Sequence, residues 1–184
     1  MRLNDVLPNS FIYDGVEYYI DLTFDNVLDV FDITSRDDLF DIEKINLGLV
    51  MYLGDVEVED PVGIWNYINS ELIEKGQRKP IQYDILGNVM PDVEEDEDIE
   101  EYFNLVQDAD LIYASFVAEY GIDLIEQQGK MHWYKFQSLL QGLSSDCILQ
   151  RVIQIRLWKP QKGDSADYKK SMRKLQNYYR LVTD

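Results

Sequence analysis

Apolar residues recur every three or four positions along most of the chain, which is the spacing of one face of an α-helix. In residues 24–31 and 39–52 this spacing predicts two helices near the N-terminus. A third helix is expected to begin at Asp60-Pro61 and to end at Gly76, because aspartate caps a helix start, proline suits the first helical position and glycine commonly ends a helix. The pattern therefore predicts a mainly α-helical fold.

The second half of the chain continues this pattern. Residues 99–120 carry apolar side chains at helical spacing and predict one long helix. Two shorter helices are expected over about 131–142 and 148–158, with Ser144 or Ser145 as the cap of the second. Because short connections favour antiparallel neighbours, we expect these two helices to share one core. That core is predicted to contain Trp133, Phe136, Leu140, Ile148, Val152 and Ile155.

One short segment favours strands over a helix. Asp14-Gly15 lies between two runs of β-favouring residues, and the central residues of a two-residue hairpin turn need the positive φ that Asp and Gly tolerate. A β-hairpin is therefore predicted over about residues 10–21. Because an isolated hairpin is only marginally stable, its apolar residues are expected to pack against helices.

The chain is expected to form one mostly helical body, residues 1–158, followed by a linker and a helix in residues 159–184. Glycine and proline near the limits of residues 77–92 make that segment the best internal hinge. Lys159-Pro160 begins the linker, since proline does not extend the preceding helix cleanly. Truncation after Trp158 is therefore expected to leave a folded body.

The last segment is predicted to be a basic amphipathic helix and is the candidate partner-binding element. Its apolar stripe requires a partner, which is either the chain's own core or the surface of another protein, including a second copy. The sequence leaves both interpretations open. The candidate partner-binding residues are Tyr168, Lys169, Met172, Arg173, Leu175 and Tyr179.

Charge is distributed unevenly along the chain. The net charge is −18, with 6 basic and 31 acidic residues in 1–129 against 11 basic and 4 acidic residues in 130–184. The negative excess argues against general binding to nucleic-acid phosphates, because such binding relies on Lys and Arg. The acidic run 94–98 is interpreted as the solvated start of a helix, because it lacks the glycine and the spaced ligands of a calcium-binding loop.

Few residues in the sequence are suited to catalysis or to metal binding. His132 and Cys147 are the only histidine and the only cysteine, too few for a structural zinc site, and no disulfide can form within the chain. His132 lies in no recognisable nucleophile motif, and no glycine-rich phosphate-binding loop occurs. We therefore expect no enzymatic activity, no catalytic or metal-binding residues and no cofactor.

Two further features concern location. No apolar run reaches the roughly 18 residues that a membrane-spanning helix needs, and the N-terminus lacks the apolar stretch of a signal sequence. A single cysteine suits a reducing compartment. We therefore expect a cytoplasmic protein that binds neither membranes nor nucleic acid.

Three motifs follow one another in the C-terminal half of the chain. Residues 120–124 are Tyr-Gly-Ile-Asp-Leu, residues 131–136 are Met-His-Trp-Tyr-Lys-Phe and residues 139–143 are Leu-Leu-Gln-Gly-Leu. Ser115-Phe116 precedes them and Ile155-Arg156 follows. In this order and spacing the motifs resemble the bacteriophage gene-product-fifteen family of siphophages and of prophages in Gram-positive bacteria.

The N-terminal hairpin and the acidic helical region are similar to the same family, so the resemblance covers about residues 1–158. It implies a tail assembly chaperone, encoded between the major tail protein and the tape-measure protein, that keeps the tape-measure protein soluble and recruits tail-tube subunits. It also implies a location in the host bacterial cytoplasm, absence from the finished virion and no catalytic residues. The alternative is an acidic mimic of nucleic acid, such as an anti-restriction inhibitor, which the net charge of −25 over residues 1–129 favours.

Overall fold

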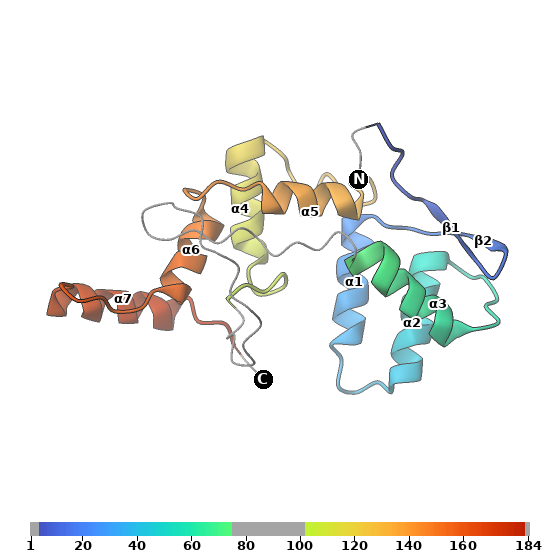
Figure 1. Cartoon of the computed structure of the whole chain (residues 1–184), viewed down its shortest axis with the longest axis horizontal. Helices are drawn as coiled ribbons and strands as arrows, with labels where there is room; N and C mark the ends of the chain where they lie inside the picture. The colour runs from blue at the N-terminus through green and yellow to red at the C-terminus, as the bar shows by residue number, and fades with distance from the viewer. Residues whose placement is uncertain (1–3, 75–101, 183–184) are drawn as a thin grey trace. The chain divides into compact units, whose positions relative to one another are not determined.

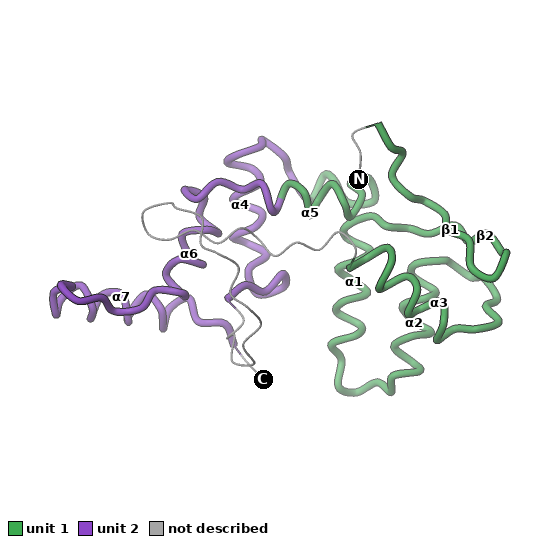
Figure 2. Tube along the Cα trace, viewed as in Figure 1, with its two compact units in different colours: residues 1–78, 125–139 green, residues 79–124, 140–184 purple. Residues whose placement is uncertain are grey.

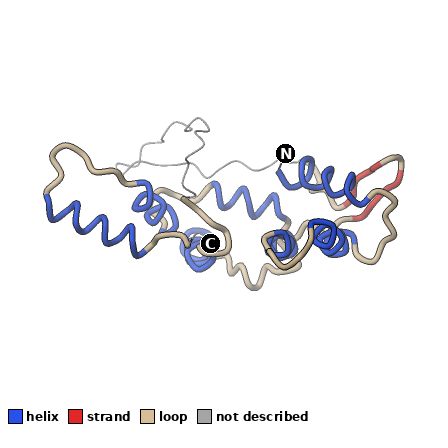
Figure 3. The backbone as a smooth tube through the Cα atoms, turned by 90° about the horizontal axis from the view of Figure 1, so that it is seen from below, coloured by secondary structure: helices blue, strands red, loops and turns tan. Residues whose placement is uncertain are grey.

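The structure, a computed structural model, describes residues 4–74 and 102–182 (Figure 1). Helices and loops make up most of this part of the chain, and the only strands described there form one antiparallel hairpin (Figure 3). The predicted mainly α-helical fold with a small N-terminal hairpin is therefore confirmed. The elements in chain order are β1 (Ser10–Tyr13), β2 (Val16–Tyr19), α1 (Phe24–Thr34), α2 (Asp41–Leu53), α3 (Pro61–Tyr67), the π-helix η1 (Ile68–Ile73), α4 (Ala109–Tyr120), α5 (Trp133–Gln141), α6 (Ile148–Leu157) and α7 (Ala166–Tyr178).

The chain divides into two compact units (Figure 2). Unit 1 comprises Met1–Arg78 and Ile125–Leu139, and unit 2 comprises Lys79–Leu124 and Leu140–Asp184. In unit 1, α1 packs on α2 and α2 on α3; in unit 2, α6 packs on both α4 and α7. The expected hinge at 77–92 and the acidic run 94–98 lie outside the described residues. The expected division into a helical body, residues 1–158, and a separate segment, residues 159–184, stays a prediction.

The N-terminal hairpin forms where Asp14-Gly15 predicted it. Both turn residues have positive φ, 48° for Asp14 and 81° for Gly15. Phe11 pairs with Tyr18 across the two strands, and both side chains are buried on the inner side of the hairpin. The ring of Tyr67 stacks on that of Phe11 with centroids 5.3 Å apart, so the hairpin packs against α3 as expected.

Asp60 joins the hairpin to the start of α3. One carboxylate oxygen accepts a hydrogen bond from the backbone N–H of Gly63 at 2.9 Å, which confirms the predicted helix cap. The other oxygen accepts from the hydroxyl of Tyr13 at 2.9 Å. This bond raises the pKa of Tyr13 above its usual value, because an ionised Tyr13 could no longer donate to Asp60. A Cβ at Gly63 would overlap the Asp60 carboxylate and the Tyr13 hydroxyl, so any larger residue here would have to displace these groups.

Unit 1 is closed by the segment that begins α5. The backbone N–H of Trp133 donates to the carbonyl of Leu22 at 2.7 Å, and the N–H of Phe24 donates to the carbonyl of Met131 at 2.9 Å. These two bonds form a short bridge between segments more than a hundred positions apart in sequence. The bridge places Trp133 at the base of α1, inside the core.

The predicted common core of the helices at 131–142 and 148–158 is wrong in part. Trp133 and Phe136 are buried in unit 1, whereas Leu140 and Val152 are buried in unit 2. Ile148, at the first position of α6, is 40% exposed. Apolar spacing identifies which side chains are able to pack together, but it does not tell which compact unit each joins.

The helix predicted over 99–120 begins later than expected, at Ala109. Before it, the side-chain oxygen of Asn104 accepts hydrogen bonds from the backbone N–H groups of Val106 and Gln107. The carboxylate of Asp108 accepts from the N–H of Asn104. Asn and Asp compete in this way with the backbone bonds of a helix, and residues 102–108 form a loop, whereas residues 99–101 lie outside the described part of the chain.

The cap of α6 also differs from the prediction. Cys147 occupies the cap position, with its sulfur accepting from the N–H of Gln150 at 3.4 Å. Ser144, one of the two expected caps, instead bonds through its N–H and its hydroxyl to the carboxylate of Glu119 near the end of α4. The serine therefore connects α4 to the loop before α6.

Close approach of α2 and α3 depends on a glycine. A Cβ built on Gly48 would overlap the ring of Trp65 and lie 3.3 Å from a methyl carbon of Val30. Gly48→Ala should therefore lower the free energy of unfolding by about 1–3 kcal/mol, the usual cost of overpacking. Urea unfolding of the variant measures this loss.

The matched control is Asn46→Ala, at an exposed position of the same helix. Alanine there should leave stability unchanged or raise it by a few tenths of a kcal/mol, because it favours a helix more than asparagine does. At an uncrowded helical site Gly→Ala also stabilises. A more stable Gly48→Ala protein would thus show that α2 and α3 do not approach each other closely.

Candidate protein-interaction site

The one histidine of the chain has a structural position. His132 Nε2 lies 3.0 Å from the carbonyl oxygen of Pro8, and the backbone N–H of Tyr134 donates to Nδ1 at 3.1 Å. A neutral ring with its proton on Nε2 satisfies both contacts at once. Cys147 is buried under the start of α6. Across residues 4–74 and 102–182, no three metal-ligating side chains come together.

The C-terminal helix α7, the predicted partner-binding element, is attached to α6. The hydroxyl of Ser165 caps α7 by accepting from the N–H of Tyr168 at 3.1 Å. The rings of Tyr168 and Trp158 meet edge to face with centroids 5.8 Å apart, and Met172 is buried in unit 2. One side of α7 therefore contributes to the core of its own unit.

A side chain from α7 also covers the end of α6. The amide of Gln176 donates to the carbonyl of Arg156 at 3.2 Å and to that of Trp158 at 2.8 Å. The last carbonyls of a helix have no partner within the helix, so these bonds satisfy groups that otherwise need water. Gln176 thus fixes α7 relative to the end of α6.

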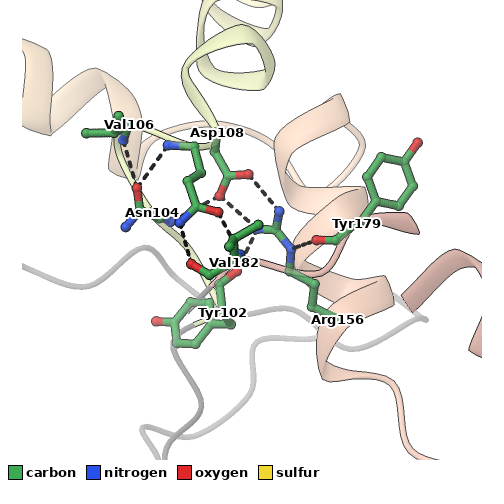
Figure 4. Close-up of polar contacts among 8 residues, drawn as sticks. Tyr102, Asn104, Val106, Asp108, Arg156, Tyr179 and Val182 are labelled. Atoms are coloured by element: carbon green, nitrogen blue, oxygen red, sulfur yellow. Dashed lines mark hydrogen bonds and ion pairs between the residues drawn. The ribbon is translucent and has the colours of Figure 1, made fainter. Parts of the chain in front are cut away.

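A buried ion pair lies where α6, the end of α7 and the loop before α4 meet (Figure 4). The two terminal nitrogens of Arg156 donate to the two carboxylate oxygens of Asp108, each at 2.7 Å. Arg156 also donates to the carbonyls of Tyr179 at 2.6 Å and Tyr102 at 3.0 Å. The side chains of Arg156 and Asp108 are only 11% and 1% exposed. Such a planar, two-bond pair fixes orientation as well as charge.

The chain beyond α7 is held by a second contact beside this pair (Figure 4). The amide of Gln107 donates to the carbonyl of Val182 at 2.9 Å and accepts from its N–H at 2.8 Å. Leu181 is buried next to it. Met172 and Leu181 are core side chains of unit 2, and deletion after Trp158 would remove both. The structure therefore does not support the expectation that this truncation leaves a folded body.

The six predicted partner-binding residues lie in different environments on this segment. Tyr168, Arg173 and Leu175 are exposed, Lys169 and Tyr179 are half-buried, and Met172 is buried. Their predicted role in binding a partner stays a prediction. The solvent-exposed side of α7 carries Lys170, Arg173, Lys174 and Tyr178, of which Tyr178 is 80% exposed.

Tyr178 was not among the predicted residues, although a helical projection of the sequence would have found it. It follows Lys174 by four positions, and these two side chains therefore lie one above the other on the helix. Apolar periodicity instead favoured Tyr179, whose carbonyl accepts from Arg156. The predicted stripe therefore left out Tyr178, which lies on the exposed side of α7.

A second exposed apolar surface lies on α2, and we call it the α2 face. It consists of Phe40, Ile42, Leu47 and Val50, all exposed, with Phe40 78% exposed. Ile42 and Leu49 both belong to the apolar run in residues 39–52, but only Leu49 is buried. Neighbouring exposed apolar residues of this kind commonly mark protein-binding surfaces.

Comparison with known proteins gives one family. The sequence profile of a family described as Bacteriophage Gp15 protein matches residues 3–181, nearly the whole chain. No curated protein and no solved structure matches. Within the described residues, none of the helices has both the length and the apolar character needed to cross a membrane.

Proposed function

This chain belongs to the bacteriophage Gp15 protein family, and from that premise we propose that it assists phage tail assembly by binding other proteins, without catalysing a reaction. Its clients in this proposal are the tape-measure protein, the tail-tube protein or both. It acts in the host cytoplasm and leaves before the virion is complete. The observation that carries the proposal is the family match, which extends over both compact units and α7.

The surface of the protein supports a binding role. A tape-measure protein is expected to be a long helical chain, and an amphipathic helix binds by laying its apolar side on an exposed apolar surface. The α2 face offers such a surface in unit 1. Tyr168, Leu175 and Tyr178 offer smaller apolar areas on α7 in unit 2. The net charge of −18 opposes nonspecific aggregation while these areas stay exposed.

Co-expression tests the proposal. The tape-measure protein of the same phage should be mostly insoluble when it is made alone and should become soluble, in a complex, when this chain is made with it. Deletion of the gene should give phage particles without complete tails, and a plasmid copy should restore them. Normal tails and a soluble tape-measure protein in the absence of this chain would exclude the function.

Two variants locate the contact. Arg173→Glu reverses an exposed charge of the predicted partner-binding helix and should weaken capture of the tape-measure protein, whereas Arg173→Lys keeps the charge and serves as the control.

The alternative function, a mimic of nucleic acid, makes a different prediction. The purified protein would then inhibit a restriction nuclease or displace DNA from a DNA-binding protein, which an assembly factor does not do.

A further inference from the structure

We propose that the exposed side of α7 docks on the α2 face of a second copy of this chain, so that copies associate head to tail. The proposal does not depend on the function in tail assembly, because it concerns contacts between identical chains. It rests on the exposure of the α2 face, on the opposite charges of the two helices and on the way α7 is fixed within its own unit.

The α2 face is suited to receive a helix. Phe40, Leu47 and Val50 lie on the side of α2 away from the buried Gly48, Leu49 and Tyr52, and Ile42 is exposed at the start of the helix. Phe40 and Leu47 lie in one row about two turns apart, and Val50 follows Leu47 by about one turn. Their exposure shows that no described part of unit 1 covers them. An unoccupied apolar side of this length matches the side of another helix.

The surroundings of the α2 face are strongly negative. Residues 4–74 carry 17 acidic and 2 basic side chains, a net charge of −15. Asp37, Asp41 and Glu43 are exposed at or just before the start of α2. Glu43 accepts a hydrogen bond from the backbone N–H of Phe40, which holds its side chain beside the apolar residues. A helix that docks here therefore needs positive charge next to an apolar side chain.

The chain itself contains a helix with that character. Residues 166–180 carry 5 basic side chains and 1 acidic side chain, a net charge of +4. Lys170, Arg173 and Lys174 are exposed, and none of them takes part in the ion pairs formed among the described residues. Tyr178 projects among them with a ring that is 80% exposed. Lysine stems and a tyrosine ring can cover apolar surface while their polar ends stay in water.

Contacts inside unit 2 decide which side of α7 is free. Met172 is buried, Gln176 bonds to the end of α6 and the carbonyl of Tyr179 bonds to Arg156. These contacts occupy the inner side and hold the basic side outward as a fixed surface. A preformed helix loses little conformational entropy when it binds, which favours association through this side.

The geometry of such a contact has a consequence for assembly. The two surfaces differ, so each copy brings one α2 face and one α7, and binding between two copies leaves one of each free. Association therefore continues into rings or short chains.

Two helix sides bury less than the roughly 1,200 Å² of a stable interface, so the contact is expected to be transient. Because it joins opposite charges, salt should weaken it.

The first test measures association of the full-length protein by sedimentation velocity. The average mass should rise between about 1 and 200 μM protein at low salt, the range of a weak interface. It should fall back to the monomer at roughly 0.5 M salt, where charges are screened within a few ångström. A protein that stays monomeric throughout at low salt would overturn the proposal.

Charge reversal with a matched control locates the contact. Lys170→Glu with Lys174→Glu should weaken association about tenfold or more, because each change replaces attraction by repulsion. Lys159→Glu with Lys162→Glu changes the net charge equally in the exposed linker before α7 and should leave association unchanged. Equal weakening by both pairs would show that only total charge matters and would contradict the docking of α7.

Mixing two inactive variants tests the head-to-tail arrangement. Val50→Arg blocks the α2 face but keeps α7, whereas the Lys170→Glu, Lys174→Glu protein keeps the α2 face. Each should be monomeric alone, and a mixture should form a dimer and nothing larger. Circular dichroism should show that both variants are folded, as expected at exposed positions. A mixture that stays monomeric would place the contact elsewhere. If the mixing experiment fails in this way, the co-expression experiment still tests the function in tail assembly independently.

Discussion

Replacing Trp133 with alanine should lower the free energy of unfolding by about 3–5 kcal/mol, the range for removal of a large buried aromatic side chain. Trp133 is almost fully buried in unit 1. The ring of Phe31 meets it edge to face with centroids 5.7 Å apart, and the ring of Phe136 stacks on it at 5.5 Å. Alanine would remove both contacts and leave a cavity that the surrounding helices fill only in part.

Urea unfolding followed by circular dichroism measures this effect without using tryptophan fluorescence. Trp133→Phe should cost much less, because phenylalanine keeps most of the ring contacts. The indole N–H of Trp133 has no hydrogen-bond partner among the described residues, so phenylalanine loses no such bond. Tyr178→Ala, at an exposed aromatic ring, is the control and should leave the transition midpoint in place. An unchanged midpoint for Trp133→Ala would contradict the burial of Trp133.

Features that depend on neighbouring residues could be predicted from the sequence. The hairpin turn at Asp14-Gly15 requires two positive φ values, and few residue pairs other than Asp-Gly meet that requirement. The cap at Asp60 depends on a carboxylate three residues before an N–H group. Gly121 ends α4 in the left-handed conformation, again for a local reason. In each case the decisive interaction lies within a few residues.

Contacts between distant segments could not be predicted in this way. Asp108 and Arg156 are 48 positions apart, and nothing in the spacing of either residue indicates the other. The burial of Asp108 has the same origin, because it depends on a partner, Arg156, in a distant helix. One sequence cannot show which of its 35 acidic residues loses its contact with water.

The candidate interaction site shows the same limit. Apolar spacing identified α2 and α7 as amphipathic helices, but it did not tell which apolar residues remain exposed. Leu49 and Ile42 both belong to the apolar run in residues 39–52, and only Leu49 is covered. On α7, Met172 fitted the partner-binding stripe and is instead buried in unit 2. Periodicity predicts that a side chain can pack, whereas the tertiary arrangement decides whether it packs within the chain or remains free for a partner.

The second large effect is expected at the buried ion pair. Asp108→Asn should lower the free energy of unfolding by about 3–5 kcal/mol, because it leaves the charge of Arg156 buried without its partner. Arg156→Lys should also destabilise, since lysine cannot replace two parallel bonds to Asp108 and the bonds to the carbonyls of Tyr179 and Tyr102. The double variant Asp108→Asn, Arg156→Met removes both charges together. It should lose less stability than Asp108→Asn and Arg156→Met lose in sum, because each single variant leaves a lone buried charge and the double variant leaves none.

The surface pair Arg36–Asp38 is the matched control for this cycle. It has the same chemistry, with two hydrogen bonds from one guanidinium to one carboxylate, but its side chains are 52% and 66% exposed. Asp38→Asn should hardly change the unfolding curve, because water and salt already screen that pair. If Asp38→Asn and Asp108→Asn had equal effects, burial would not be the source of the large loss.

Loss of the buried pair should also be detectable at the C-terminal end of the chain. Arg156 holds the carbonyl of Tyr179, so a variant that displaces this side chain should free the segment around Tyr179–Val182 before the rest of unit 2 unfolds. Hydrogen exchange of amides in that segment should therefore speed up in Asp108→Asn, while exchange in α1 and α2 of unit 1 stays unchanged. Exchange that speeds up equally in both units would instead indicate global unfolding, and unchanged exchange would show that Arg156 does not hold the C-terminal segment in place.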